Sequence, residues 1–254
     1  MTLFVETRGH GPDVVMLHGW GLHGGIFDRV AASLAERFCV HLVDLPGHGG
    51  SAALPRFDAD TVAALLNEHF PLPVQLVGWS LGGLIAQHWA ARFPDKIKSL
   101  ALVATSPRFV RDDSWPHAQQ RAAIEAVGAS LESAFEQTLE RFLALQMMGA
   151  PAARDTVKAV REQLFSHGRP QGLLPALELL LEADARDLAG QIHCPVALLY
   201  GVRDAITPIG AGRWLQSVLS DATLYEFTQA SHAPFLSHQD EFVAKLAQHL
   251  EASA

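Results

Sequence analysis

The sequence has few cysteines and no long apolar run, and each shortage excludes a class of protein. Only two of the 254 residues are cysteines, and both lie in or beside apolar segments, as buried thiols do in a reducing compartment. No segment approaches the roughly 18 uninterrupted apolar residues of a membrane span, and no basic stretch followed by an apolar one opens the chain. We therefore expect a soluble, cytoplasmic protein without disulfides.

Basic residues are also scarce. Nineteen Lys and Arg stand against 27 Asp and Glu, a formal net charge of −8, which argues against a nucleic-acid-binding protein. With 49% hydrophobic and 18% charged residues, the composition is that of a globular protein and excludes a disordered one. The length fits one α/β core carrying an insertion.

Short apolar segments alternate with segments of helical periodicity, the pattern of a mostly parallel sheet covered by helices on both faces. The predicted strands are residues 14–17, 38–43, 74–78, 100–103, 196–200 and 223–227. The predicted helices are residues 26–37, 59–70, 81–93, 211–219 and a last one after His238.

Residues 107–189 interrupt this alternation. They contain helical patterns broken by Gly and Pro and no candidate strand. We predict an α/β core made of residues 1–106 and 190–254, with a helical lid inserted at 107–189.

The strongest chemical signal is the segment GWSLG at residues 78–82, a GxSxG that directly follows a predicted strand and precedes a predicted helix. This is the context of a nucleophile elbow, in which a sharp turn exposes a serine hydroxyl at the edge of the sheet. Ser80 is therefore the candidate nucleophile. The alternative is that Ser80 only caps the helix that follows it.

A serine nucleophile needs a histidine as base and an acid that orients the histidine. In a fold of this kind the acid follows a late strand and the histidine follows the next one. Asp204 and His232 occupy these positions among 13 histidines. The alternative pair is Asp221 and His238, although His238 is better placed to begin the last helix.

An acyl-transfer site also needs N–H donors for the developing oxyanion. The expected donors are the backbone N–H groups of Leu81 and of Trp20, in the loop HGWG at residues 18–21. Trp20 and Trp79 would present apolar faces to an acyl chain, unless both are core aromatics. His18 is expected to be a structural hydrogen-bonding residue.

A competing motif, GxGxxG, is formed by Gly19, Gly21 and Gly24, with Asp44 20 residues further on. Formally this is a dinucleotide-binding fingerprint. The bulky Trp20 and His23 in the turn argue against it. No Cys and His cluster has the spacing of a metal site, so neither a metal nor a cofactor is expected.

In six segments the chain resembles the α/β-hydrolase superfamily: LHGWGL, VDLPGHG, GWSLGG, RFLALQ, YGVRD and SHAPF. More narrowly, it resembles the pimeloyl-acyl-carrier-protein methyl ester esterases of biotin synthesis, on account of Trp20, Trp79 and residues 141–146. The resemblance covers nearly the whole chain. It implies that the nucleophile, acid, base and oxyanion donors are Ser80, Asp204, His232, Trp20 and Leu81.

The resemblance further implies that Phe142 contacts the substrate and that a basic lid surface binds the carrier protein. Residues 141–170 hold five basic residues against two acidic ones, a net charge of +3 that leaves −11 for the rest of the chain. The candidate carrier-binding residues are Arg141, Arg154, Lys158 and Arg161. An ordinary solvated face is the alternative. Gln137 and Thr138 lie about one helical turn before Arg141, where a further basic residue would extend the basic surface. Their presence there predicts weaker carrier binding.

The hypothesis is a monomeric serine carboxylesterase that hydrolyses the methyl ester of pimeloyl-acyl-carrier protein through an acyl-enzyme on Ser80. One alternative is an esterase for short-chain or aromatic esters, because pocket shape rather than the triad sets the substrate. The other is a non-catalytic, ligand-binding protein of the same fold. Reaction with a fluorophosphonate would separate the last from an enzyme.

Overall fold

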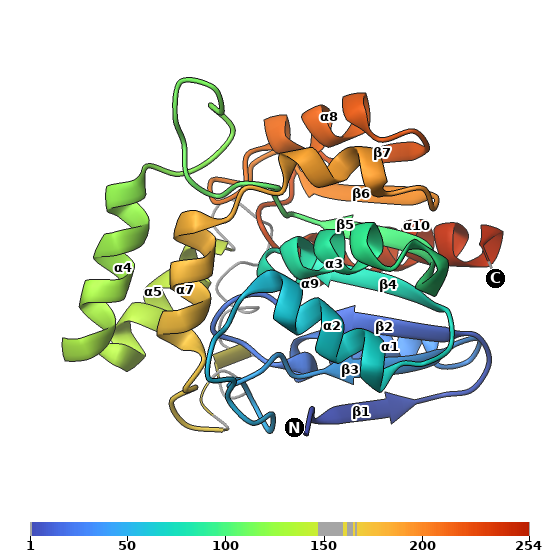
Figure 1. Ribbon diagram of the computed structural model, residues 1–254, viewed down its shortest axis with the longest axis horizontal. Coiled ribbons are helices and arrows are strands. Elements are labelled where there is room, and N and C mark those ends of the chain that lie inside the picture. The colour runs from blue at the N-terminus through green and yellow to red at the C-terminus, as the bar shows by residue number, and fades with distance from the viewer. Residues whose placement is uncertain (1, 147–159, 162–164, 166, 254) are drawn as a thin grey trace.

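A seven-stranded sheet forms the centre of the molecule in the computed structural model, which describes residues 2–146, 160–161, 165 and 167–253 (Figure 1). The strand order is β1-β3-β2-β4-β5-β6-β7, and every neighbouring pair is parallel except β1 with β3. The predicted mostly parallel sheet is confirmed. The strands are β1 (Val5–Arg8), β2 (Asp13–Leu17), β3 (Cys39–Val43), β4 (Val74–Trp79), β5 (Ile97–Val103), β6 (Val196–Gly201) and β7 (Ala222–Phe227).

Strand β1 was not predicted from the sequence. It is a four-residue edge strand whose two central residues, Glu6 and Thr7, are exposed. An edge strand of this kind has no continuous apolar run, so the signal that reveals the buried strands is missing.

Helices cover both faces of the sheet. Helices α2 (Ala59–His69) and α3 (Leu81–Arg92) pack together on the face toward the viewer in Figure 1, and α1 (Asp28–Leu34) packs with α10 (Gln239–Ala252) behind it. Helices α8 (Ile209–Val218) and α9 (Pro234–Ser237) complete the core. Asp58 sets the start of α2, because its carboxylate accepts a hydrogen bond of 2.9 Å from the N–H of Thr61.

Among the described residues, three helices form a separate layer at one end of the sheet, on the left in Figure 1. They are α4 (Arg121–Ser133), α5 (Phe135–Gln146) and α7 (Leu173–Glu182), all inserted between β5 and β6, and we call them the cap. They fall within the predicted lid. No helix in the described part of the chain is long and apolar enough to cross a membrane.

The prediction of helix from residue 107 onward is wrong for residues 107–120. This segment is a loop that closes on itself through isolated bridges between Val110 and Gln119 and between Asp112 and Trp115. The Asp112 side chain accepts a 2.8 Å hydrogen bond from the N–H of Ser114, which favours a turn over a helix.

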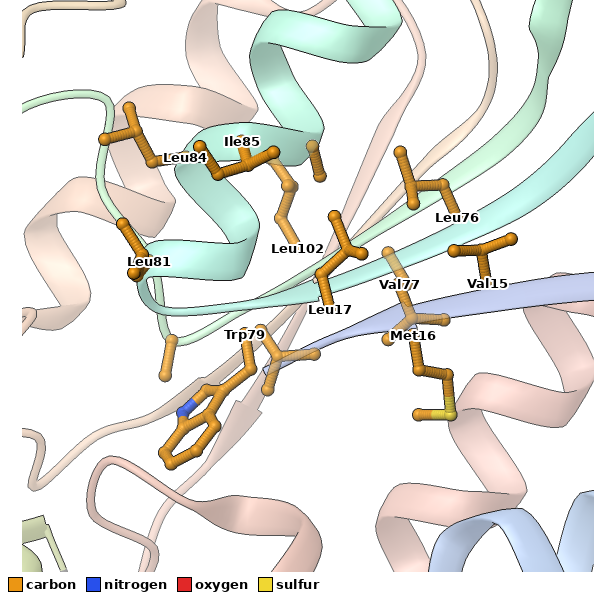
Figure 2. Packing of buried hydrophobic residues seen from close by; sticks show 14 of the residues in the cluster. Val15, Met16, Leu17, Leu76, Val77, Trp79, Leu81, Leu84, Ile85 and Leu102 are labelled. Atoms are coloured by element: carbon orange, nitrogen blue, oxygen red, sulfur yellow. The ribbon is translucent and has the colours of Figure 1, made fainter. Parts of the chain in front are cut away.

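The core lies on both sides of β2 and β4 (Figure 2). Leu17 and Leu76 point to the side of the sheet that α3 covers, whereas Met16 and Trp79 point to the opposite side. Because both faces are covered, these strands are apolar without alternation. They form a rigid base from which the turn after β4 projects.

Candidate active site

Ser80 lies in the turn between β4 and α3, with a backbone φ of 53° and ψ of −115°. A positive φ is unfavourable for a residue with a side chain, so the surrounding structure must hold the turn in place. The neighbouring glycines allow this close approach. A Cβ on Gly78 would lie 2.5 Å from the carbonyl oxygen of Gly82, and one on Gly82 would collide with the carbonyl oxygen of Leu17.

The end of β5 anchors this turn. The N–H of Ser80 donates to the carbonyl of Val103 (3.0 Å), and the Thr105 hydroxyl donates to the carbonyl of Ser80 (2.6 Å). Ser80 makes no side-chain capping hydrogen bond to α3, so the helix-cap interpretation is wrong. The hydroxyl remains available for chemistry.

Asp204 lies in the loop that follows β6 and is 6% exposed. Its Oδ1 accepts hydrogen bonds from the N–H groups of Ile206 (2.7 Å) and Thr207 (2.9 Å). Its Oδ2 accepts from the Thr207 hydroxyl (2.7 Å) and lies 2.8 Å from Nδ1 of His232. These contacts hold the buried carboxylate in a fixed position beside the imidazole.

His232 follows β7 and is 1% exposed. Because Nδ1 faces the Asp204 carboxylate, we assign its proton to that bond, which leaves Nε2 free to accept a proton. The backbone is held from two sides: the N–H donates to the carbonyl of Gln146 in α5 (3.0 Å), and the carbonyl accepts from Nε1 of Trp79 (2.9 Å). Trp79, the residue directly before Ser80, thus contacts His232, and the centroids of the two rings are 5.5 Å apart.

The alternative pair does not come together. Asp221 precedes β7 and so lies at the amino end of that strand, whereas Ser80 follows the carboxyl end of β4. His238 stands between α9 and α10, where its ring lies 6.4 Å from that of Phe227. The structure thus brings together the acid and base that chain order selected.

Sequence reasoning missed Thr207. Its hydroxyl lies 2.7 Å from Oδ2 of Asp204, 2.9 Å from the carbonyl oxygen of Ala104 and 3.2 Å from Nδ1 of His232. The available signal was an aspartate followed three residues later by a threonine, a spacing at which local turns bond side chain to backbone.

A narrow apolar cavity of about 120 Å³ opens beside Ser80. Trp20 and Phe142 line it, with ring centroids 5.1 Å apart in an edge-on arrangement, and the cap contributes most of the other apolar side chains. A larger and more polar hollow of about 460 Å³ lies between Trp115, Asp184 and Trp214, and Ser80 is not among its lining residues. The smaller cavity is therefore the candidate substrate site.

Trp79 does not line this cavity. It is fully buried on the other side of the sheet from Leu84, packed against Phe27 and Phe235 as well as His232 (Figure 2). The structure therefore places Trp79 beneath the histidine loop and away from the wall of the candidate substrate site.

The predicted oxyanion donors are both buried backbone groups. Leu81 is the first residue of α3, where N–H groups lack an acceptor within the helix. Among the hydrogen bonds of the described residues, neither this N–H nor that of Trp20 has an acceptor. Both are therefore free to meet an anionic oxygen.

The predicted structural role of His18 is confirmed. Its Nδ1 bonds the carbonyl of Gly19 (2.8 Å), and its Nε2 accepts from the N–H of Leu45 (2.9 Å). Burial, followed by the neighbouring His48, lowers the pKa of His18 well below its usual value, so the ring stays neutral. It fixes the loop that carries Trp20.

The dinucleotide hypothesis finds no support in the same region. The buried Asp44 carboxylate accepts hydrogen bonds from the N–H groups of Gly24 (2.7 Å) and Gly50 (2.8 Å). Both oxygens are thus engaged within the protein and face no ribose.

Of the candidate carrier-binding residues, Arg154 and Lys158 lie outside the described residues. Arg141 is exposed on α5, and Arg161 is exposed and forms an ion pair of 2.5 Å with Glu140. Arg141 and Arg161 line one shallow groove together with Gln137. The carboxylate of Glu140 offsets part of the positive charge that the two arginines give this groove.

Comparison with known proteins places these features in context. Residues 14–245 match the model of the alpha/beta hydrolase family. The chain is 80% identical over 254 residues, all of both chains, to a pimeloyl-acyl-carrier-protein methyl ester esterase from Chromobacterium violaceum. It is 41% identical to one from Vibrio vulnificus, over 95% of each chain.

Solved structures share the fold at low sequence identity. An esterase from Exiguobacterium antarcticum superposes with a TM-score of 0.92 at 23% identity, covering 98% of this chain and 95% of its own. A bromoperoxidase from Bacillus anthracis gives 0.90 at 22% identity, with the same coverage. Since these proteins carry different names, their likeness supports the fold alone.

Proposed function

The chain belongs to the alpha/beta hydrolase family and, within it, to the pimeloyl-acyl-carrier-protein methyl ester esterases, and from this premise we propose how its own residues carry out the reaction. It is a carboxylic ester hydrolase that acts on the methyl ester of pimeloyl-acyl-carrier protein in biotin synthesis. The observation that carries this conclusion is the 80% identity over the full length.

In the proposed mechanism the Ser80 hydroxyl attacks the ester carbonyl while Nε2 of His232 takes its proton. The negative charge on the carbonyl oxygen is stabilised by the N–H groups of Trp20 and Leu81. His232 then returns the proton to the methoxy group, methanol leaves, and the acyl group remains on Ser80. Asp204 holds the imidazole in the required tautomer and stabilises its protonated form.

The second half of the reaction uses water in place of serine. His232 removes a proton from the water molecule, whose oxygen attacks the acyl-enzyme, and the proton passes to Oγ of Ser80 as the ester bond breaks. The products are methanol and a carboxylic acid still attached to its carrier. No step needs a cofactor.

We propose that the cavity beside Ser80 holds the apolar part of the acyl chain against Trp20 and Phe142. Its walls are mostly aliphatic and aromatic, which suits methylene groups. The carrier protein stays outside, on the surface that includes Arg141 and Arg161. Trp79 acts one layer below, because its indole N–H holds the backbone of the base.

The test is Ser80→Ala, which should lower kcat by roughly three to six orders of magnitude while the protein still folds. Ser33→Ala, at an exposed serine of α1, is the matched control and should keep full activity. Esterase activity near wild type in folded Ser80→Ala would end the proposal. Fluorophosphonate labelling that depends on Ser80 separates a catalyst from a binding-only protein.

A general esterase for small esters is the second candidate, favoured only by the small volume of the cavity, about 120 Å³. It predicts equal kcat/KM for a free methyl ester and for the same ester on its carrier. We further propose a monomer in the cytoplasm, the location being supported by two cysteines that are both unpaired.

A further inference from the structure

A cluster of three side chains lies at the amino ends of β2 and β3, the end of the sheet opposite Ser80. It consists of Asp13, Cys39 and His41. Strands β2 and β3 are parallel and pair Asp13 with Cys39, at the amino ends of both strands. His41 is two residues beyond Cys39 and so projects from the same face. One ligand atom from each of the three lies within 4.8 Å of the other two.

The chain spacing did not reveal this cluster, because Asp13 is 26 residues from Cys39 and only strand pairing joins them. We propose that these three side chains bind a divalent transition-metal ion of the zinc class. Thiolate, imidazole and carboxylate together are a donor set that suits zinc, and three protein ligands leave a fourth tetrahedral position for water.

The surroundings of His41 prepare it for this role. Its Nε2 lies 2.8 Å from Oδ1 of Asp13, and its Nδ1 lies 2.9 Å from the hydroxyl of Thr7, which is opposite His41 on β1. Without an ion, the Nε2–H of His41 donates to the Asp13 carboxylate and Nδ1 accepts from the Thr7 hydroxyl; when an ion binds Nε2, the imidazole proton is carried by Nδ1, which then donates to the Thr7 hydroxyl oxygen. Orientation of a ligating imidazole by a hydrogen bond on its other nitrogen is common in metal sites.

Access and charge are also compatible with a cation. The side chains of His41 and Asp13 are 14% and 39% exposed, so an ion can enter from solvent. The adjoining basic residues are engaged elsewhere, Arg8 with Glu6 and Asp28 and Arg37 with Glu251. The ring of Phe70 covers His41 at 5.3 Å and limits its movement.

Binding exchanges protons for the ion. The entering ion forms a bond to Sγ as the thiol proton leaves to solvent, and no oxidant or reductant takes part.

The experiment titrates the full-length, metal-free protein with Co²⁺, which reports a thiolate ligand by a charge-transfer band in the near ultraviolet, and then displaces it with Zn²⁺. We expect saturation at one ion per chain. Cys39→Ser should abolish the band, and Asp13→Asn and His41→Ala should each weaken binding by at least about tenfold.

Cys194→Ser and His193→Ala are the matched controls, since they remove the other thiol and an exposed imidazole beside it. Both should bind Co²⁺ as the wild type does. Hydrolysis of a small ester by each variant checks folding, because the cluster lies away from Ser80. Absence of saturable binding, or a thiolate band that survives in folded Cys39→Ser, would overturn the proposal.

Discussion

Replacing Thr207 with valine tests whether the hydroxyl beside the acid and the base matters for catalysis. Valine keeps the shape of threonine and removes only the hydroxyl, which donates to Oδ2 of Asp204 (2.7 Å) or to the carbonyl of Ala104 (2.9 Å). A hydrogen bond to a charged group contributes about 1.5–3 kcal/mol, so the free energy of unfolding should fall by about 2 kcal/mol. Denaturant unfolding measures this loss.

The same substitution should lower kcat/KM by about tenfold to a hundredfold, since each factor of ten corresponds to about 1.4 kcal/mol of transition-state stabilisation. Without the hydroxyl, the Asp204 carboxylate is held less firmly and therefore positions the imidazole of His232 less well for proton transfer.

Thr207→Ser is the matched variant, because it restores the hydroxyl and loses only a methyl group. It should recover most of the activity and most of the stability. The reasoning is refuted if valine leaves kcat/KM unchanged, or if serine fails to restore what valine loses.

Three further predictions concern the acid, acid stability and the carrier surface. Asp204→Asn should fold normally and lower kcat by about four orders of magnitude, because the amide favours the wrong imidazole tautomer; activity close to wild type in a kinetic assay would contradict this. Burial lowers the pKa of His48 in the folded protein to about 4, below its ordinary 6.5. As the pH falls, His48 is therefore protonated in the unfolded chain before it is protonated in the folded one. Stability should decline by about 2 kcal/mol from about pH 7 to about pH 5 through this residue, and urea unfolding of His48→Gln should show a smaller decline. Charge reversal of Arg141 and Arg161 to Glu should raise KM severalfold for the carrier-linked ester at low salt and leave p-nitrophenyl ester hydrolysis unchanged; equal losses on both substrates would show that this face does not bind the carrier.

Chain order and local motif were enough to predict that Asp204 and His232 lie together, and the structure pairs their side chains at 2.8 Å. The GxSxG between a strand and a helix fixed where Ser80 would stand, and the loops after the last two strands contained few alternatives to Asp204 and His232. Parallel strands bring the residues after their carboxyl ends to one edge of the sheet, so this part of the site follows from topology.

The contacts that depend on side-chain packing could not be predicted. Whether Trp79 faces substrate or core is decided by which side of β4 it occupies, and a strand buried on both faces gives no alternation to reveal it. The Asp13, Cys39 and His41 cluster needs the pairing of β2 with β3, which the sequence alone does not specify. Strand β1 was not predicted, because an exposed edge strand lacks the apolar run that reveals a buried one.

The backbone of His232 joins two parts of the molecule that the chain builds separately. Its carbonyl is held by Trp79 of the sheet, and its N–H is held by Gln146 at the end of cap helix α5. Any displacement of that helix end would break the second bond and release the base on one side. The position of His232 therefore depends on where α5 ends as well as on the sheet, so a substitution that shifts the end of α5 acts on the histidine as well as on the cavity that Phe142 lines.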